Sequence, residues 1–351
     1  MTRSPPTVSQ FLRGVSRSFG LSIQLLPAAV REPVGLAYLL ARATDTVADT
    51  ASQPVAHRLT LLDSLQHAFT HPQDNPQLSH ALHDFARHVA DPHEQALLRQ
   101  SQACLDTLTR LPQADQAVIR QVLDAITQGQ RWDLTALDTR GQGVPTAGAL
   151  DRYTWLVAGS VGEFWTRICE LHLREWHTAT FAELLQWGAH YGKGLQRLNI
   201  LRDAGKDLRA GRCYWPAEEL EPLGLDSAGL CEAARSRDMA TLQRLHPLFE
   251  SWLRTTQEQL HDGLRYSLAL RGQRLRLASA LPCLIGVRTL ALLRAAGPRA
   301  LVEHIKLPRR EVRRLLLALV LRGVSDRQLR ASWTAALPPA EPSPVSARIG
   351  T

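Results

Sequence analysis

Asp45 and Asp49 form the first pair of residues in the sequence whose type and spacing indicate chemistry. Residues four apart lie one above the other on a helix, so the two carboxylates share a face, with Arg42 one turn earlier. On a solvated helix such a pair is common and costs only about 0.2–0.5 kcal/mol. Here it follows the apolar stretch LAYLLARAT at 36–44, where carboxylates need a cation or metal ion to neutralise them. The pattern favours a metal site over a surface pair.

A second stripe of oxygen ligands lies in the stretch NILRDAGKD at 199–207. Asn199, Asp203 and Asp207 follow one another at intervals of four, with Arg202 beside them. Magnesium prefers oxygen ligands and is often held by one or two carboxylates together with substrate phosphates. Two such stripes facing each other across a helical bundle predict a site where metal ions and arginines neutralise a diphosphate, so that it leaves and a carbocation forms in an apolar pocket.

The elements that must position these stripes are helices. Apolar residues recur at intervals of three and four along most of the chain, whereas alternating strand patterns are scarce. Proline- and glycine-rich stretches separate these segments. We therefore predict an all-α bundle of about ten or more helices, forming one domain over residues 1–336, and a disordered, proline-rich tail over 337–351. The clearest helical patterns are at 8–26, 57–69, 92–111, 116–126, 181–203, 247–270 and 310–324.

Composition narrows the class of protein. The chain has 351 residues and a formal net charge of +8, which suits anionic partners as well as an ordinary solvated surface. The arginines are scattered and no nucleic-acid motif occurs, so a nucleic-acid partner is not expected. Five widely spaced cysteines predict neither disulfides nor a zinc site. With no signal-peptide pattern and no long apolar run, we expect a cytoplasmic protein without a transmembrane helix, for which peripheral membrane contact is plausible.

Several ordered blocks of the sequence resemble the squalene and phytoene synthases, a family that joins two prenyl diphosphates head to head. The blocks are SRSFGLSIQLLP, YLLARATDTVADT, GQRWDL, DRYTWLVAGSVGEFW and LNILRDAGKDLRAGRCYWP, and the resemblance extends from about residue 15 to about residue 321. Their order and the two aspartate-rich motifs make the resemblance specific. It implies a type I isoprenoid synthase bundle with a central apolar cavity, which would bind farnesyl diphosphate and several Mg²⁺ ions.

The resemblance also assigns roles to individual residues. Asp45, Asp49, Asn199, Asp203 and Asp207 are implied to bind Mg²⁺, the four aspartates being catalytic together with Tyr153. A phenol is a weak base, so a diphosphate oxygen is an alternative proton acceptor to Tyr153. Substrate contacts are implied for Ser16, Arg17, Ser18, Phe19, Arg42, Val157, Gly159, Gly162, Gln196 and Arg202. For the two glycines, simple helix packing is an equally good interpretation.

The motif wording is closer to squalene synthases than to phytoene synthases. The stretch EHIKLPRREV resembles a basic flap that helps hold NADPH, which implies Lys306, Arg309 and Arg310 as cofactor ligands. A charged turn before a helix is the simpler interpretation of that stretch. We therefore expect a squalene synthase, which couples two farnesyl diphosphates through presqualene diphosphate and then reduces the intermediate with NADPH.

Some positions depart from the family pattern. Ala48, Thr50 and Lys206 stand where acids are frequent, and VRTLALLRAAGPRA at 287–300 replaces a tyrosine and asparagine cluster that usually precedes the flap. Without the reductive step the product would be dehydrosqualene, phytoene or presqualene diphosphate. A non-catalytic family member that acts as a binding or assembly protein is the alternative of another class. The sequence leaves prenyl chain length and oligomeric state open.

Overall fold

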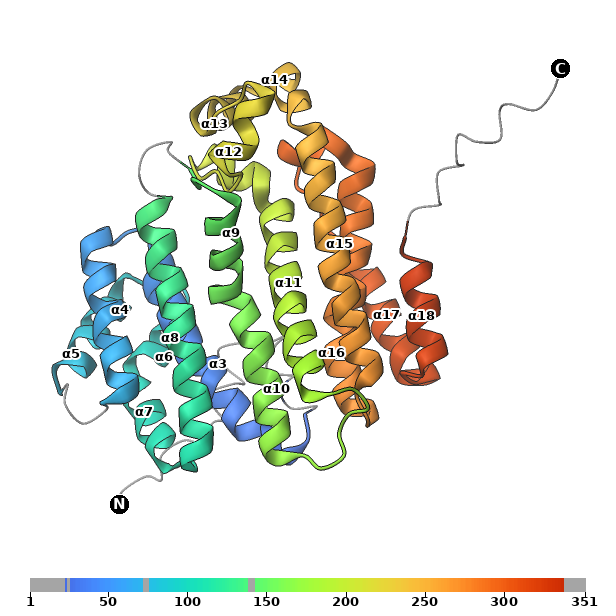
Figure 1. The fold of residues 1–351 in the computed structure, drawn as a ribbon. Coiled ribbons are helices and arrows are strands. Elements are labelled where there is room, and N and C mark those ends of the chain that lie inside the picture. Colours follow the sequence, from blue (N-terminus) through green and yellow to red (C-terminus); the bar gives the residue numbers. More distant parts are fainter. Residues whose placement is uncertain (1–22, 24–25, 72–75, 138–142, 338–351) are drawn as a thin grey trace.

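The computed structural model describes residues 23, 26–71, 76–137 and 143–337, and these residues form a helical bundle (Figure 1). Within those ranges there is no strand, only an isolated bridge between His177 and Leu270. The predicted all-α class is confirmed. The first predicted helix, 8–26, falls almost wholly outside the described residues, as do Ser16, Arg17, Ser18, Phe19 and all of the predicted tail except Leu337.

The bundle divides into a first group of helices and a second group that packs along it. The first group comprises α3 (Ala28–Asp49), α4 (Val55–Thr70), α5 (Pro76–Phe85), η1 (Ala86–His88), α6 (Pro92–Arg99), α7 (Ser101–Arg110) and α8 (Gln113–Ala136). The second comprises α9 (Ala147–Thr154), η2 (Trp155–Gly159), α10 (Ser160–His172), α11 (Phe181–Arg209), α12 (Ala217–Leu220), η3 (Glu221–Leu223), α13 (Ser227–Ser236), α14 (Met239–Arg244), α15 (His246–Ala269), α16 (Gln273–Ala296), η4 (Gly297–Leu301), α17 (Arg309–Arg322) and α18 (Asp326–Thr334).

The bundle has two apolar cores, and the first of them also includes side chains of the second group, such as Ile168 of α10, Leu184 of α11 and Tyr266 of α15. One core gathers around α3, α4 and α8 and includes Leu36, Leu62 and Phe85, whereas the other surrounds α11, α15 and α16 and includes Trp215 and Phe249. Helix α11 begins with a capping box, in which the Thr180 hydroxyl accepts from the Glu183 backbone and the Glu183 carboxylate accepts from the Thr180 backbone. The apolar periodicity that predicts α4, α8, α11 and α15 is thus the pattern of their buried faces.

Helix α16 is the longest helix that the periodicity does not identify. Its buried residues lie on several sides, because it packs between α15 and α17 and also contacts α11, so no polar stripe marks it. The stretch Gln273–Leu301 is long and apolar enough, by composition, to cross a bilayer, and half of its most apolar window is buried in the bundle. A second difference concerns the predicted helix at 92–111, which is divided at Gln100 into α6 and α7.

Close helix packing explains the glycines of the VAGSVG stretch. A Cβ on Gly162 would lie 1.9 Å from the backbone oxygen of Gly188, and one on Gly192 would lie 2.1 Å from the backbone oxygen of Ala158. No side chain fits at such distances, so η2 and α10 approach α11 only because these residues are glycines. The chain makes a π-helical turn over Trp155–Gly159, a feature that often accompanies functional sites.

Candidate active site

The first aspartate pair lies in the last two turns of α3. The side chain of Asp45 is 44% exposed, yet protein surrounds it closely enough that burial, reinforced by the charge of Asp49, raises its pKa to about 6. The Gln130 amide of α8 donates a hydrogen bond to Oδ1 of Asp45. Nη1 of Arg42 lies 3.9 Å from Oδ2 of Asp45. Asp45 therefore carries negative charge that its neighbours only partly neutralise.

A third helix contributes an acid beside this pair. Glu94, in the first turn of α6, forms an ion pair and a hydrogen bond with Arg42. Burial alone would lower the pKa of Arg42, but the charges of Glu94 and Asp45 outweigh it and raise that pKa. Arg42 thus remains charged among the acids, and it lies where an anionic group would meet both Arg42 and the aspartates.

The second stripe lies near the end of α11. Asn199 is exposed, whereas Asp203 and Asp207 are half-buried. Nη2 of Arg202 lies 2.7 Å from Oδ2 of Asp203, and burial raises the pKa of Asp207 to about 6. Arg212 and Lys206 pull that pKa down, while Asp203 and Asp133 push it up. The surroundings of Asp207 therefore disfavour its ionised form.

Asp133 of α8 connects the two stripes. Its charge raises the pKa of Asp49 on α3 and also that of Asp207 on α11, in each case in addition to burial. Helix α8 packs directly against α3 and also against η2, which in turn packs on α11. Acids from three helices therefore influence one another electrostatically. The residue that interacts with acids of both predicted motifs, Asp133, was not itself predicted.

Arg212 is the counter-ion of this group. It forms an ion pair with Asp133 and donates a hydrogen bond of 3.0 Å to the Tyr214 hydroxyl, which itself donates to Oδ1 of Asp133 at 2.8 Å. Burial opposes its charge, but Asp133, Tyr214 and Asp207 together raise the pKa of Arg212. Its charge lowers the pKa of both Asp49 and Asp207. One guanidinium thus interacts with carboxylates from three helices, α3, α8 and α11.

Tyr153 lies in the same network and is buried. Its ring packs 4.9 Å from that of Trp132 and 5.9 Å from that of Tyr214. Burial, the charge of Asp133 and the hydrogen bond with Tyr214 raise the pKa of Tyr153 well above its usual value near 10. The phenol is therefore neutral, able to donate or accept a hydrogen bond but not to act as a phenolate base.

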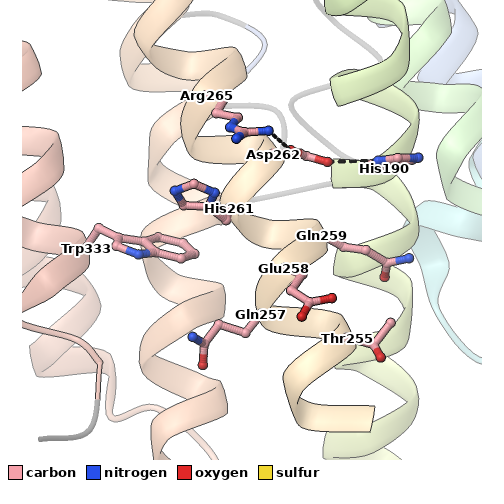
Figure 2. A pocket seen from close by; sticks show the side chains of 9 residues that line it. All are labelled: His190, Thr255, Gln257, Glu258, Gln259, His261, Asp262, Arg265 and Trp333. Atoms are coloured by element: carbon pink, nitrogen blue, oxygen red, sulfur yellow. Dashed lines mark hydrogen bonds and ion pairs between the residues drawn. The ribbon is translucent and has the colours of Figure 1, made fainter. Parts of the chain in front are cut away.

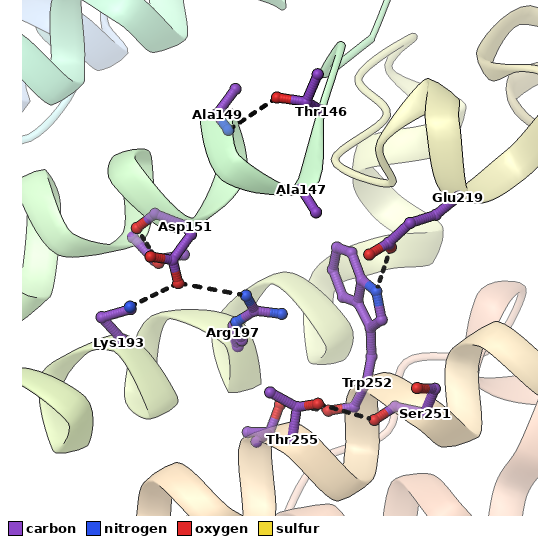
Figure 3. Close-up of polar contacts among 12 residues, drawn as sticks. Thr146, Ala147, Ala149, Asp151, Lys193, Arg197, Glu219, Ser251, Trp252 and Thr255 are labelled. Carbon is purple, nitrogen blue, oxygen red and sulfur yellow. Dashed lines mark hydrogen bonds and ion pairs between the residues drawn. The ribbon is translucent and has the colours of Figure 1, made fainter.

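Two cations fix the helix that carries Tyr153 (Figure 3). Nζ of Lys193 lies 2.5 Å and Nη2 of Arg197 lies 3.7 Å from Oδ1 of Asp151, two residues before Tyr153. Arg197 also lies over the Trp252 ring, 5.5 Å from its centre. Burial lowers the pKa of Arg197, and the charge of Asp151 raises it. The Asp151 carboxylate therefore stabilises the charged form of this partly buried guanidinium. These contacts join α9 to α11.

The remaining predicted substrate residues are dispersed. Gln196 lies one turn before Asn199 on α11, and Val157 lies in η2 against Gly129 of α8, where a Cβ would come within 2.5 Å of its Cγ1. Gly159 and Gly162 have a packing role, since a Cβ on Gly159 would lie 2.9 Å from Cδ1 of Trp155. Close helix packing therefore explains why these residues are glycines. Their predicted contact with substrate stays a prediction.

The predicted cofactor residues lie on another part of the bundle. Lys306 precedes α17, Arg309 and Arg310 begin it, and all three are exposed. Helix α17 packs on α16, far from α3 and α8 (Figure 1). The chain that leads into α17 nonetheless passes close to the second stripe. A Cβ on Gly205, which lies between Asp203 and Asp207 on α11, would be 2.3 Å from the backbone oxygen of Leu301 in η4.

The positions that depart from the family pattern have structural explanations. Ala48 is buried, and its carbonyl accepts a 2.6 Å hydrogen bond from the buried Arg58. A carboxylate at position 48 would therefore replace a buried methyl group and would itself be buried. The Thr50 hydroxyl donates to the Thr46 backbone at 2.6 Å, whereas Lys206 is exposed and lowers the pKa of Asp207.

A separate pocket of about 590 Å³ lies along α15 (Figure 2). It is lined by His190, Asp262, Arg265 and Trp333, among others, and contains none of the predicted site residues. His190 and Arg265 both contact the Asp262 carboxylate, at 2.8 Å and 3.2 Å. All of its lining residues except Trp333 are polar or charged and the pocket is open to solvent, unlike a site for a hydrocarbon chain.

No group of three His, Cys, Asp or Glu side chains within the described ranges is close enough to hold a metal ion unaided. The acids instead act on one another in pairs: Asp45 with Asp49, Asp49 with Asp133, Asp133 with Asp207, and Asp203 with Asp207. Pairs of carboxylates suit Mg²⁺, which keeps several water or phosphate ligands. The donor set fits an ion that shares its coordination sphere with a bound phosphate group.

The residues of this site that were not predicted include Glu94, Asp133, Arg212 and Tyr214. Asp133 lies in the GQRWDL block, and Arg212 and Tyr214 lie in the GRCYWP stretch, so blocks already singled out carried the sequence signal. Glu94 carries no such signal, because an acid in the first turn of a helix is ordinary. Only its contact with Arg42 identifies it.

Known proteins resemble this chain over most of its length. A family model described as squalene/phytoene synthase matches residues 12–313. Squalene synthase of Yarrowia lipolytica is 30% identical over 205 residues, which are 58% of this chain and 43% of that protein. Squalene synthase ERG9 of Saccharomyces cerevisiae is 29% identical over 209 residues, which are 60% of this chain and 45% of that protein.

Among solved structures, the complex of TcSQS with the ligand E5700 superposes with a TM-score of 0.69. It is 24% identical, and the match covers 94% of this chain and 88% of the other, which shows a common fold. The two fungal relatives are matched over less than half of their own length.

Proposed function

Because the chain belongs to the squalene and phytoene synthase family, we propose that it joins two prenyl diphosphates head to head, with farnesyl diphosphate as substrate and squalene as product. The observation that carries the proposal is the electrostatic coupling of Asp49, Asp133 and Asp207, which belong to three different helices. Acids that gather from three helices and are only partly neutralised by Arg42 and Arg212 are what a diphosphate and its cations require.

The residues that would hold Mg²⁺ are Asp45, Asp49, Asn199, Asp203 and Asp207, with Asp133 as an addition from the structure. Bound Mg²⁺ would supply Lewis-acid neutralisation of the diphosphate charge, which makes that group a better leaving group. Arg42 and Arg212 remain charged beside the same acids and would hold phosphate oxygens. Arg202 would do the same next to Asp203.

Tyr153 would orient the reacting groups as a neutral hydrogen-bonding phenol. Its raised pKa makes proton removal by a phenolate unfavourable, so a diphosphate oxygen is the better proton acceptor when the cyclopropyl ring of presqualene diphosphate closes. Trp132 and Tyr214 flank Tyr153 with aromatic faces, which stabilise nearby positive charge. The pair Asp151 and Lys193 would keep α9 in place during the reaction.

A second candidate function lacks the reductive step. Lys306, Arg309 and Arg310, the proposed NADPH ligands, are exposed around the start of α17, apart from the acids of α3 and α8. If they do not bind the nucleotide, the protein would release dehydrosqualene, phytoene or presqualene diphosphate. A non-catalytic binding role is disfavoured because every implied magnesium ligand is retained.

One experiment distinguishes these functions. The purified chain is incubated with farnesyl diphosphate and Mg²⁺, with and without NADPH, and the lipid extract is identified by mass spectrometry. Squalene formed only with NADPH supports the first proposal, and a dehydrogenated or cyclopropyl product in both samples supports the second. No coupling product from farnesyl or geranylgeranyl diphosphate would refute both enzymatic proposals.

A further inference from the structure

Helix α17 exposes an unusual combination of side chains. Leu317, Val320 and Leu321 are 59%, 59% and 75% exposed, and they are among the few large apolar residues at the surface of the described chain. Leu315 and Leu319, on the opposite side of the same helix, are buried in the second core. The helix therefore has an apolar face toward the bundle and a second apolar face toward solvent.

Arginines continue this outer face toward the start of the helix. Arg310, Arg313 and Arg314 precede Leu317 and Leu321 at intervals that include three, four and seven, so they share a stripe. All three are exposed, and none of them forms an ion pair within the part of the chain that the structure describes. We call Arg310, Arg313, Arg314, Leu317, Val320 and Leu321 the α17 surface.

We propose that the α17 surface docks on an anionic lipid bilayer, its leucines and valine entering the interface while its arginines meet the headgroups. Helices that lie in the plane of a membrane combine these two kinds of residue. Arginine clusters on such helices recognise anionic lipids. Helix α17 forms the outer edge of the bundle together with α18, on the side away from α4 and α5 (Figure 1), where a flat surface can reach it.

A second copy of the chain fits this surface poorly. Helix α17 has five arginines and a single acid, Glu311, so two α17 surfaces facing each other would bring like charges together. Three strongly exposed apolar residues are also far fewer than the roughly 20–30 residues that each partner contributes to a stable protein interface. A bilayer supplies both the negative charge and the apolar layer.

Membrane docking deepens the proposed function, because squalene is apolar and needs a lipid phase to receive it. The proposed function supplies the reason why the protein would bind a membrane, but it is not part of the evidence that the α17 surface binds one. Its evidence is the surface itself, and its test needs no turnover, so the two proposals can fail separately.

The test is flotation of the full chain with vesicles of mixed phosphatidylcholine and phosphatidylglycerol, compared with phosphatidylcholine alone. We expect binding to the anionic vesicles that weakens with salt. The double variants Leu317→Gln/Leu321→Gln and Arg313→Gln/Arg314→Gln should each bind at least about tenfold more weakly. Leu171→Gln on α10, which replaces another exposed leucine, and Arg99→Gln/Arg110→Gln on α6 and α7 are the matched controls and should bind like wild type.

Orientation on the vesicle is tested with a probe. All five cysteines are buried, so a cysteine introduced by Leu321→Cys can be labelled selectively with an environment-sensitive fluorophore, as can one introduced by Leu171→Cys. Anionic vesicles should shift the emission of the first probe to the blue and leave the second unchanged. Equal shifts, no binding by wild type, or equal losses in the control variants would overturn the proposal. So would a lipid-free dimer that Leu317→Gln/Leu321→Gln converts to monomer.

Discussion

The hydroxyl of Tyr214 donates a hydrogen bond of 2.8 Å to Oδ1 of Asp133, joining the end of α8 to the segment that follows α11. Arg212 contacts the same carboxylate and the same hydroxyl. The two halves of the proposed site are therefore connected by a short network whose members lie 81 residues apart in the sequence. The members of such a network polarise one another, so a substitution at one of them should alter the hydrogen bonding and the pKa values of the others.

Replacing Asp133 tests the centre of the network. Asp133→Asn keeps the shape of the side chain but removes the charge that Arg212 faces, so we expect kcat to fall about 100-fold or more. The pKa of Asp49 and that of Asp207 should both decrease, because a like charge has gone. Asp124→Asn, on the exposed face of the same helix, is the control. The measurement is kcat from steady-state kinetics. Wild-type turnover in Asp133→Asn would show that Asp133 has no role in the active site.

Stability should depend on pH because the pKa of Asp45 and that of Asp207 are each raised to about 6. Their unfolded-state pKa is about 4, so between these values the folded protein binds more protons and stability falls as pH rises from about 4 to about 6. The double variant Asp45→Asn/Asp207→Asn should keep only the part of this fall that comes from Asp49, because the pKa of Asp49 is raised as well. Calorimetric Tm values across that range, wild type against variant, check it. An unchanged pH profile in the variant would contradict the assigned pKa shifts.

Binding of Mg²⁺ and pyrophosphate requires the same carboxylates in their ionised form. The stabilisation that Mg²⁺ and pyrophosphate confer together should therefore grow as pH rises through about 6. Mg²⁺ without pyrophosphate should stabilise much less, since the acids approach only in pairs. The measurement is the shift in Tm with each addition. Equal stabilisation by Mg²⁺ alone would show that the protein forms a complete metal site by itself.

Tyr153→Phe removes the phenol and leaves the ring. We expect kcat to fall about 10- to 100-fold, with slower formation of the cyclopropyl intermediate, and no change in the alkaline part of the pH profile, because the phenol is neutral there. The matched control is Tyr266→Phe, which also removes a buried hydroxyl, the one bonded to Thr166 at 2.9 Å. That variant should lose about 1 kcal/mol of stability and keep its kcat. Single-turnover kinetics separate the two cases.

Gly162→Ala and Gly192→Ala test the packing of η2 and α10 on α11. Each new Cβ would fall about 2 Å from a backbone oxygen, so we expect a loss of about 1–3 kcal/mol in the free energy of unfolding. Gly148→Ala in the first turn of α9 is the control, because its Cβ meets only the Thr146 hydroxyl at 3.8 Å. Urea denaturation gives all three values. Loss of activity without loss of stability would favour substrate contact instead.

Lys306→Ala tests the reductive step. We expect NADPH-dependent squalene release to fall while formation of presqualene diphosphate continues, since the positive charge would serve only the nucleotide phosphates. Arg87→Ala, an exposed cation on η1, is the control. The two half-reactions are measured separately with and without NADPH. An equal effect on both would exclude a nucleotide role for Lys306.

The local patterns in the sequence predicted much of this protein. A period of 3.6 residues identifies helices α4, α6, α7, α8, α11, α15 and α17. The same period places Asp45 with Asp49, and Asn199 with Asp203 and Asp207, because side chains four apart share a face of a single helix. Blocks around Tyr153 and the two aspartate motifs identified the family. Periodicity did not identify helix α16, since a helix buried on several sides shows no polar stripe.

The tertiary structure decided how those elements meet. Asp133 and Arg212 are 79 residues apart, so no local pattern indicates that they form an ion pair or that Asp133 acts on the acids of both α3 and α11. The raised pKa values depend on burial and on charges from other helices. Helix periodicity determines which side chains share a face, but only packing determines which faces share a site.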